Sequence, residues 1–247
     1  MKTLRWIGLS LMAIVLIAVI ALFVVNEKEP TGYKGTEADK LAKDMLTALN
    51  YDAFNELKYL QFTFFRGKHH YRWDKANNVA EVVWDDKKVV MQLDTKEAKV
   101  IVDGAPVVEE AQKAAYVNEA WKYWCNDSFW MIAPYKIFDA GTERSIIETV
   151  HANTKGLKVH YASGGYTPGD SYVWEIGPDN KPVSWKMWTS ILPVKGMETT
   201  WEKWIDVEGA LLSTYHSNPV LEMEMQNIKG GNDLTALGWA PDTFSYK

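Results

Sequence analysis

The chain has 247 residues, with 27 basic and 32 acidic side chains and a formal net charge of −5. Hydrophobic residues make up 47% and charged residues 24%, which is globular composition and excludes a wholly disordered chain. An acidic chain without a basic run argues against nucleic acid as the main partner, because phosphate binding requires clustered Lys and Arg. The single cysteine, Cys125, excludes an intramolecular disulfide and a thiolate metal cluster.

The first 26 residues resemble a membrane-targeting segment. Residues 7–25 (IGLSLMAIVLIAVIALFVV) carry no charge, and at about 1.5 Å of helical rise per residue they just span a hydrocarbon core of about 30 Å. The run is longer than the apolar part of most secretory signals, and no small-x-small cleavage site follows it. We therefore expect residues 1–26 to form an uncleaved signal anchor with a transmembrane helix; a cleaved leader is the alternative.

The charges that flank this run predict its orientation. Lys2 and Arg5 precede it, and Glu27 and Glu29 follow it. Basic residues favour the cytoplasmic side of a membrane. The expected location is therefore inner-membrane-anchored, with the body of the protein in the periplasm.

After a predicted linker at residues 27–35, we expect a single extracytoplasmic domain over residues 36–247. Residues 36–57 repeat apolar side chains at near-helical spacing and predict one helix. A second helix is predicted within residues 107–125, where one apolar stripe consists of Val117, Ala120, Trp121 and Trp124. Residues 126–128 (NDS) are expected to end this helix or to cap it again.

The remaining segments alternate apolar and polar residues with a period of two, which is typical of strands. Five consecutive strands are predicted between Tyr59 and Asp103. Seven more follow at Ser145–His151, Leu157–Ala162, Ser171–Ile176, Val183–Ile191, Met197–Asp206, Ala210–Ser217 and Leu221–Asn227. Strands that are apolar on one face must bury that face. The predicted fold is therefore mainly β (α+β): a curved antiparallel half-barrel of about 11–12 strands, with helices covering the concave face.

The predicted inward-facing side chains are large and apolar. They are Phe62, Phe64, Trp73, Met91, Trp185, Met187, Trp201 and Met223. In one interpretation they fill the interior as a solid core. In the other they line a pocket that the helices only partly fill, and flexible methionines suit such a pocket.

Residues 66–73 (RGKHHYRW) resemble the Arg-Pro-Gly-x-Phe-x-Trp stretch of periplasmic lipoprotein carriers of the LolA/LolB type, although the proline is absent. Residues 83–90 (VWDDKKVV) resemble the hairpin that follows it in those carriers. The resemblance implies an unclosed antiparallel barrel covered by helices, with an apolar cavity that takes acyl chains. It also implies that Arg66 latches a helical lid; a strand-end arginine paired with a nearby carboxylate is the alternative.

The second half of the chain looks similar to a group of uncharacterised exported Bacteroidetes proteins. The residues that carry this resemblance lie at 126–130 (NDSFW), 133–136 (APYK) and 167–170 (TPGD). That group is usually assigned a carrier-like fold, and the resemblance implies no activity.

Motifs for catalysis or metal binding are absent from the sequence. The adjacent His69 and His70 point to opposite faces of a strand, so they cannot chelate one ion together. Cys125, at the end of a predicted helix, is interpreted as a small buried residue. No serine-nucleophile elbow or phosphate loop occurs. We predict no catalytic residue, no metal and no cofactor.

Three functions remain open. The first is a membrane-anchored extracytoplasmic protein that binds a lipid, an acyl chain or a lipoprotein in the half-barrel cavity. The second is a non-enzymatic envelope scaffold or sensor that docks a protein partner, because Trp188 and Trp204 fall on the predicted polar face. The third is a cell-envelope hydrolase, which requires His69, His160 and His216 to converge with carboxylates. The aromatic and methionine interior favours the first.

Overall fold

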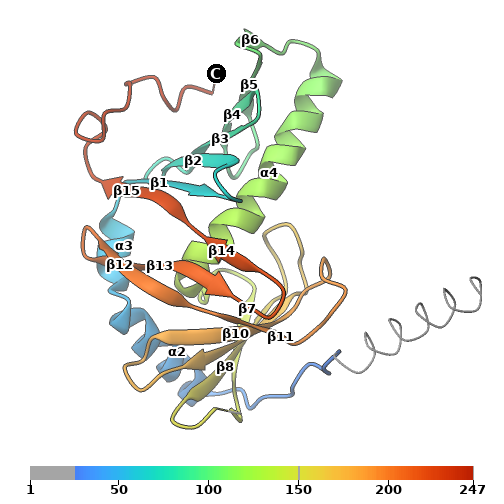
Figure 1. Cartoon of the computed structure of the whole chain (residues 1–247), viewed down its shortest axis with the longest axis vertical. Helices are drawn as coiled ribbons and strands as arrows, with labels where there is room; N and C mark the ends of the chain where they lie inside the picture. Colours follow the sequence, from blue (N-terminus) through green and yellow to red (C-terminus); the bar gives the residue numbers. More distant parts are fainter. Residues whose placement is uncertain (1–25, 150, 247) are drawn as a thin grey trace, which may run out of the picture.

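A computed structural model describes residues 26–149 and 151–246 of the chain (Figure 1). Residues 1–25, which hold the predicted anchor, lie outside the described residues. Within the described ranges, no helix combines the length and apolar character that crossing a bilayer requires.

Among the described residues, three α-helices and one 3₁₀ helix accompany the sheet. The elements are α2 (Thr36–Ala48), α3 (Tyr51–Glu56), α4 (Glu110–Ile132) and the 3₁₀ helix η1 (Ala133–Lys136). The predicted helix over residues 36–57 is two helices, because Asn50 adopts a left-handed conformation (φ 55°) that ends one and begins the other.

The first sheet has seven antiparallel strands in the order β15-β1-β2-β3-β4-β5-β6. Its members are β1 (Tyr59–Phe64), β2 (His69–Asp74), β3 (Val79–Trp84), β4 (Lys87–Gln92), β5 (Ala98–Val102), β6 (Ala105–Pro106) and β15 (Gln226–Gly231). The five strands predicted before Asp103 are therefore present, and the short β6 follows them.

Two further groups of strands complete the architecture. A five-stranded group in the order β11-β10-β9-β8-β7 consists of β7 (Thr142–Ile147), β8 (Lys155–Tyr161), β9 (Ser171–Ile176), β10 (Pro182–Trp188) and β11 (Met197–Thr200). A three-stranded group consists of β12 (Glu202–Val207), β13 (Ala210–Ser217) and β14 (Glu222–Glu224).

Backbone hydrogen bonds join these groups into one curved sheet. β11 and β12 are halves of a single predicted strand, interrupted at Trp201, whose N–H donates to the carbonyl of Val183 at 2.8 Å. β14 and β15 are likewise interrupted at Met225, whose N–H donates to the carbonyl of Thr214 at 2.8 Å. Interruptions of this kind bend a strand. The two bends let the sheet curl from β7 at one edge to β6 at the other. The predicted half-barrel is therefore confirmed.

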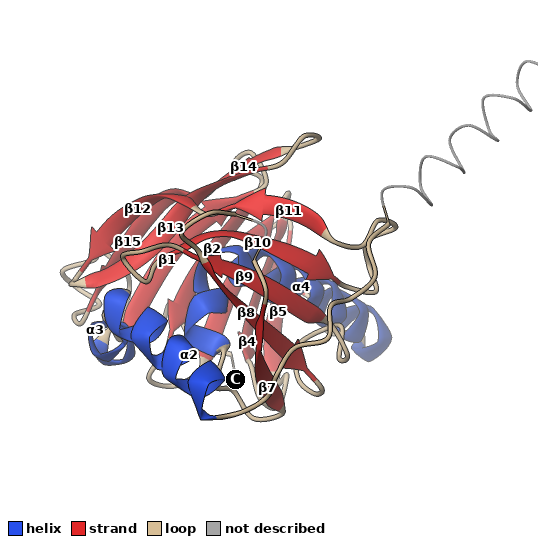
Figure 2. Ribbon diagram, turned by 90° about the horizontal axis from the view of Figure 1, so that it is seen from below, coloured by secondary structure: helices blue, strands red, loops and turns tan. Residues whose placement is uncertain are grey.

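The long helix α4 crosses the concave side, where it contacts β3, β4, β5 and β13, while α2 contacts β7 and β8 (Figure 2). The Glu109 carboxylate caps α4 by accepting hydrogen bonds from the backbone N–H groups of Ala111 and Gln112. The predicted second helix is therefore present, but it runs on to Ile132. The residues at 126–128 that we expected to end it lie inside its last turns.

Residues 26–33, which we call the N-terminal strap, lie against the convex face instead of hanging free. The indole N–H of Trp188 donates to the carbonyl of Glu27 at 3.0 Å, Lys158 pairs with Glu29 at 2.5 Å, and Tyr33 and Ile146 exchange backbone hydrogen bonds. The segment predicted as a linker thus crosses β10, β8 and β7. A small apolar cluster of Ile147, Val173 and Trp188 lies on the same face.

Candidate functional site

A cavity of about 490 Å³ lies between α4 and the strands β8–β10. Nine aromatic side chains are part of its wall. α4 contributes Trp121, Trp124, Cys125, Ser128, Phe129 and Trp130, and the strands contribute Tyr161, Tyr172, Trp185 and Met187. This volume is within the range of about 300–1,000 Å³ that small-molecule sites occupy.

Two loops complete the wall at one end of the strands. They are residues 162–170, between β8 and β9, and residues 189–196, between β10 and β11. The buried carboxylate of Asp170 joins them, because it accepts a hydrogen bond from the backbone N–H of Ser190 at 2.9 Å and another from the hydroxyl of Thr167. The positive φ angles of Gly164 (84°) and Gly165 (65°) suit the tight path of the first loop.

The wall is apolar around Trp185, while charged residues, including Asp94, Lys136 and Asp139, lie elsewhere on the lining. The indole N–H of Trp185 and the hydroxyl of Tyr161 are buried and have no hydrogen-bond partner among the described residues. They are enclosed by aromatic rings, since Trp185 lies 4.7 Å from Tyr172 and 5.0 Å from Trp130 between ring centroids. Burial also raises the pKa of the Tyr161 hydroxyl well above its ordinary value, so this group stays neutral. The part of the wall around Trp185 and Tyr161 is therefore apolar and uncharged.

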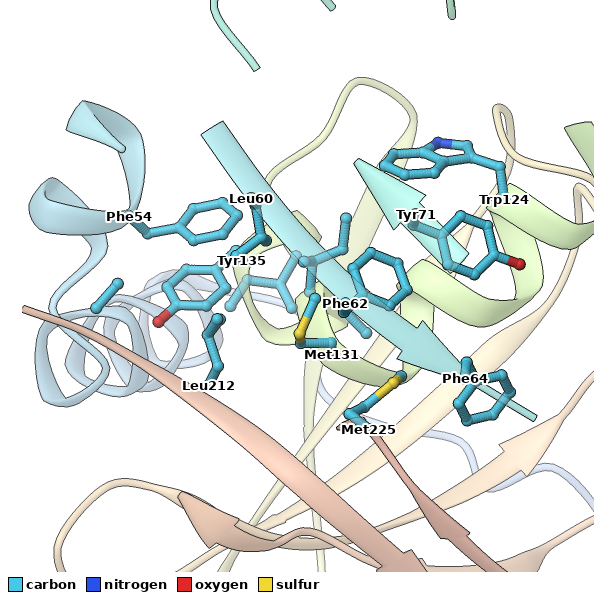
Figure 3. Close-up of a cluster of buried hydrophobic side chains, with 14 of the residues drawn as sticks. Phe54, Leu60, Phe62, Phe64, Tyr71, Trp124, Met131, Tyr135, Leu212 and Met225 are labelled. Carbon is cyan, nitrogen blue, oxygen red and sulfur yellow. The ribbon is translucent and has the colours of Figure 1, made fainter. Parts of the chain in front are cut away.

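The neighbouring part of the interior, beneath β1 and β2, is filled by a cluster of buried hydrophobic side chains (Figure 3). The rings of Phe62 and Tyr71 stack with centroids 4.6 Å apart, and those of Phe54 and Tyr135 stack at 3.9 Å. The Tyr135 hydroxyl donates to the carbonyl of Leu211 at 2.7 Å, which joins η1 to β13. Both interpretations of the interior therefore hold, each for a different part of the half-barrel.

Three of the eight residues predicted to line a pocket do line this cavity: Trp73, Trp185 and Met187. The other five do not. Phe62, Phe64, Met91 and Trp201 are buried in the core, and Met223 is half-buried on β14. All these side chains belong to the same hydrophobic interior. Alternation along the strands predicts which side chains face inward, but it does not show where α4 packs down on them.

Arg66 is exposed in the turn between β1 and β2 and makes no hydrogen bond or ion pair within the described part of the chain. It therefore does not hold α4 in this structure. The tie between sheet and helix comes from Asp127, a buried residue of α4 that accepts hydrogen bonds from His69 and Tyr71 of β2. His69 and Tyr71 lie on the same face of β2, and both bind the one carboxylate in the later turns of α4. The sequence analysis missed this tie, although a carboxylate in a largely apolar helix was the signal for it.

The histidines considered for a hydrolase have separate partners. His69 contacts Asp127, His160 lies 2.9 Å from the Ser171 hydroxyl, and His216 lies 2.9 Å from the Thr200 carbonyl. His216 is enclosed by the rings of Trp130 and Trp201, and burial lowers its pKa to about 4. Among residues 26–149 and 151–246, no group of three His, Cys, Asp or Glu side chains could hold a metal ion.

The structure also shows where Cys125, Trp188 and Trp204 lie. Cys125 lines the cavity, and burial raises the pKa of its thiol to about 12, so the thiol is protonated at neutral pH. Trp188 is buried beside the N-terminal strap, and the half-buried Trp204 stacks on Trp201 at 6.2 Å. Neither tryptophan presents the exposed face expected of a protein-docking surface.

A second hollow, of about 690 Å³, lies between α2 and the β7–β8 hairpin and is more open to solvent. Charged side chains surround it, including Glu37, Lys155 and the ion pair of Lys40 with Asp44 at 2.7 Å. It is a charged surface depression, and its lining does not suit an apolar ligand.

No protein-family model matches the chain, and no curated protein matches it. Among solved structures, the crystal structure of a DUF1329 family protein from Desulfovibrio piger aligns with a TM-score of 0.43 and 9% sequence identity. The alignment covers 83% of this chain and 97% of that chain. We draw neither a family nor a function from a likeness of this size.

Proposed function

We propose that the protein is a membrane-anchored extracytoplasmic binding protein that shelters a lipid, an acyl chain or the acyl group of a lipoprotein. The observation that carries this proposal is the aromatic cavity between α4 and β8–β10. The apolar run at residues 7–25 supports the anchor, and the resemblance of residues 66–73 to the LolA/LolB-type carriers supports the ligand class.

Burial of alkyl surface provides the binding energy, at about 0.8 kcal/mol for each methylene group transferred from water. The aromatic wall is already assembled, since Trp185 alone packs against five neighbouring rings. A preformed wall lowers the ordering cost of binding. It also selects by shape, because the wall around Trp185 is apolar.

Access depends on the loops and not on α4. The Asp127 carboxylate holds α4 to β2, whereas the loops at residues 162–170 and 189–196 have no regular secondary structure. Movement of these two loops opens the cavity while the helix stays in place. Asp170, which joins the two loops, makes them move together.

Photo-crosslinking tests the proposal with the full chain in lipid nanodiscs. A diazirine-bearing fatty acid is titrated, and the labelled peptides are identified by mass spectrometry. We expect saturable labelling on the α4 and β8–β10 peptides that line the cavity.

Two substitutions at one position make the test specific. Cys125→Trp places a large ring in the cavity, whereas Cys125→Ala leaves the cavity open. We expect the first to abolish cavity labelling and the second to retain it. Labelling that does not saturate, or that Cys125→Trp leaves unchanged, would contradict the proposal.

A further inference from the structure

Exposed apolar side chains gather at one end of the curved sheet. Phe65 lies in the β1–β2 turn, Tyr166 and Ile191 in the two cavity loops, and Val220 and Leu221 in the β13–β14 turn. These five residues, here called the apolar rim, are between 44% and 84% exposed. Large apolar side chains exposed together in this way mark an interaction surface.

The strand register places these turns at the same end. Ser171 at the start of β9 pairs with His160 of β8 and with Trp188 at the end of β10, so the loops after β8 and β10 are neighbours. On the other side of the sheet, Ser217 pairs with Glu222 at the β13–β14 turn, and Phe64 pairs with His69 at the β1–β2 turn. In an antiparallel meander alternate turns share one end, and these four turns belong to that set.

The opposite end has a different character. Its turns include residues 177–181, where Asp179 and Lys181 form an ion pair at 3.0 Å. Val183 (41% exposed) lies next to this turn, and the exposed Tyr33 lies at the sheet edge beside Ile146. Val108 (84% exposed) precedes α4, and Phe138 (37% exposed) follows η1. The apolar rim thus holds five of the nine large apolar side chains that are exposed among the described residues.

The N-terminal strap begins at the same end as the apolar rim. The Asn26 side chain accepts a hydrogen bond from the backbone N–H of Lys195 at 2.7 Å, and the Glu27 N–H donates to the Lys195 carbonyl at 3.1 Å. Lys195 belongs to the same loop as Ile191. In Figures 1 and 2, the start of the described chain and the β13–β14 turn lie on the same side of the molecule. The apolar run at residues 7–25 ends directly before Asn26.

We propose that the apolar rim docks on the surface of a lipid bilayer, the one that the apolar run at residues 7–25 enters. The tie between Asn26 and Lys195 leaves no length of free chain between that run and the rim. Side chains such as Phe, Tyr, Ile and Leu bury their apolar parts at a membrane interface, and basic side chains reach the phosphates. The exposed Arg66 and Lys68 follow Phe65 in the same turn, with the Lys68 ammonium 5.7 Å from the Phe65 ring centroid.

Docking at the rim has a consequence for the cavity. The loops that carry Tyr166 and Ile191 also line the cavity. An apolar ligand would then enter from the bilayer without crossing water, a consequence that rests on the proposed function. The docking itself rests on the membrane anchor of the proposed function but not on ligand binding.

Depth-dependent quenching tests the docking with the full chain in phosphatidylcholine nanodiscs and with no added ligand. Leu221→Cys and Val183→Cys create matched sites, 44% and 41% exposed, at opposite ends of the sheet. Each is labelled with an environment-sensitive fluorophore, and the nanodiscs contain lipids with brominated acyl chains. Labelled wild type is the control for Cys125, which is half-buried and whose thiol pKa is raised to about 12 by burial.

We expect the label at position 221 to be shifted to shorter wavelength and quenched at least twofold by the brominated lipids. The label at position 183 should behave as it does in lipid-free buffer. Equal quenching at both positions would overturn the proposal. So would a shift at position 221 that depends on protein concentration and not on bromine, because that result assigns the rim to a second copy of the chain. Either failure leaves the crosslinking result at the cavity unaffected, so the two proposals are tested separately.

Discussion

The Asp127 carboxylate on α4 lies 2.6 Å from Nδ1 of His69 on β2. The same oxygen accepts a hydrogen bond from the Tyr71 hydroxyl, and Asn126 donates to the other oxygen at 2.8 Å. Asp127 is buried among aromatic rings, where a carboxylate is tolerated only when it is hydrogen-bonded or paired. These bonds fix the position of α4 over the concave face, and with it one wall of the cavity.

Removal of this carboxylate should therefore destabilise the fold. In Asp127→Ala, His69 and Tyr71 lose their common acceptor while they remain partly or fully buried. We expect the free energy of unfolding to fall by about 3–5 kcal/mol, measured by chemical denaturation. Asp127→Asn keeps one acceptor oxygen and should cost less.

Arg66→Ala tests whether Arg66, instead of Asp127, holds α4 to the sheet. Because Arg66 is exposed and makes no described hydrogen bond, we expect a change within about 0.5 kcal/mol. A loss at Arg66 as large as that at Asp127 would show that the arginine holds the helix after all.

His216 should make stability depend on pH. Burial lowers its pKa from 6.5 to about 4 in the folded state. Between these values the unfolded chain binds a proton that the folded chain does not, so acidification favours unfolding. The contribution of neutral His216 to the free energy of unfolding should be fully present above pH 6.5. The free energy of unfolding should then fall by about 3 kcal/mol as the pH drops towards 4.

The measurement is a series of denaturant titrations from pH 7.5 to 4.5 on wild type and His216→Gln. The two proteins differ only at position 216, so the difference between the two curves reports His216. We expect the difference in the free energy of unfolding between wild type and His216→Gln to become smaller as the pH falls. Parallel curves would show that His216 titrates normally in the folded state.

Gly32→Ala should loosen the N-terminal strap. A Cβ atom at this position would lie 2.5 Å from Oγ of Ser145 and 2.7 Å from the Ile146 carbonyl oxygen, which accepts the Tyr33 N–H bond. Because a backbone atom cannot move aside easily, the strap must lift. We expect the Tyr33 amide to exchange hydrogen at least tenfold faster in NMR or mass spectrometry. The exposed Thr31→Ala is the matched control, and similar exchange in both variants would argue against close packing at Gly32.

Cys125 should be chemically inert in the folded protein. With its pKa raised to about 12 by burial, its thiolate fraction at pH 7.5 is roughly a thousandfold or more below that of a free cysteine. We expect a thiol reagent to label the native chain slowly and the chain in denaturant rapidly. Rapid labelling under native conditions would mean that the cavity opens readily to water at this position.

Local patterns in the sequence predicted much of the framework. The period-two runs from Tyr59 to Asp103 appear as β1–β5, because alternation directly determines which side chains face a core. The apolar stripe with Val117 and Trp124 correctly predicted α4. Its end was predicted too early, at residues 126–128, because Asp127 was interpreted as a polar stop instead of the partner of His69 and Tyr71.

The site depended on contacts between segments that are far apart in the chain. Phe62 and Trp185 face the same interior, yet Phe62 lies in packed core and Trp185 lines a cavity. Nothing in either strand distinguishes the two, because the difference is the path that α4 takes across the sheet. The bends at Trp201 and Met225, which split two predicted strands, likewise come from the curling of the whole sheet.

By itself, then, the sequence determined the alternation of strands, the two main helical regions and the concave apolar face, because each depends on neighbouring residues in the chain. Only the tertiary structure decided where that face is filled and where it is hollow. It also decided that Asp127 and not Arg66 ties down the helix, and that the strap begins beside the apolar rim. These features depend on which distant surfaces meet, and that is set when the sheet curls and α4 packs into it.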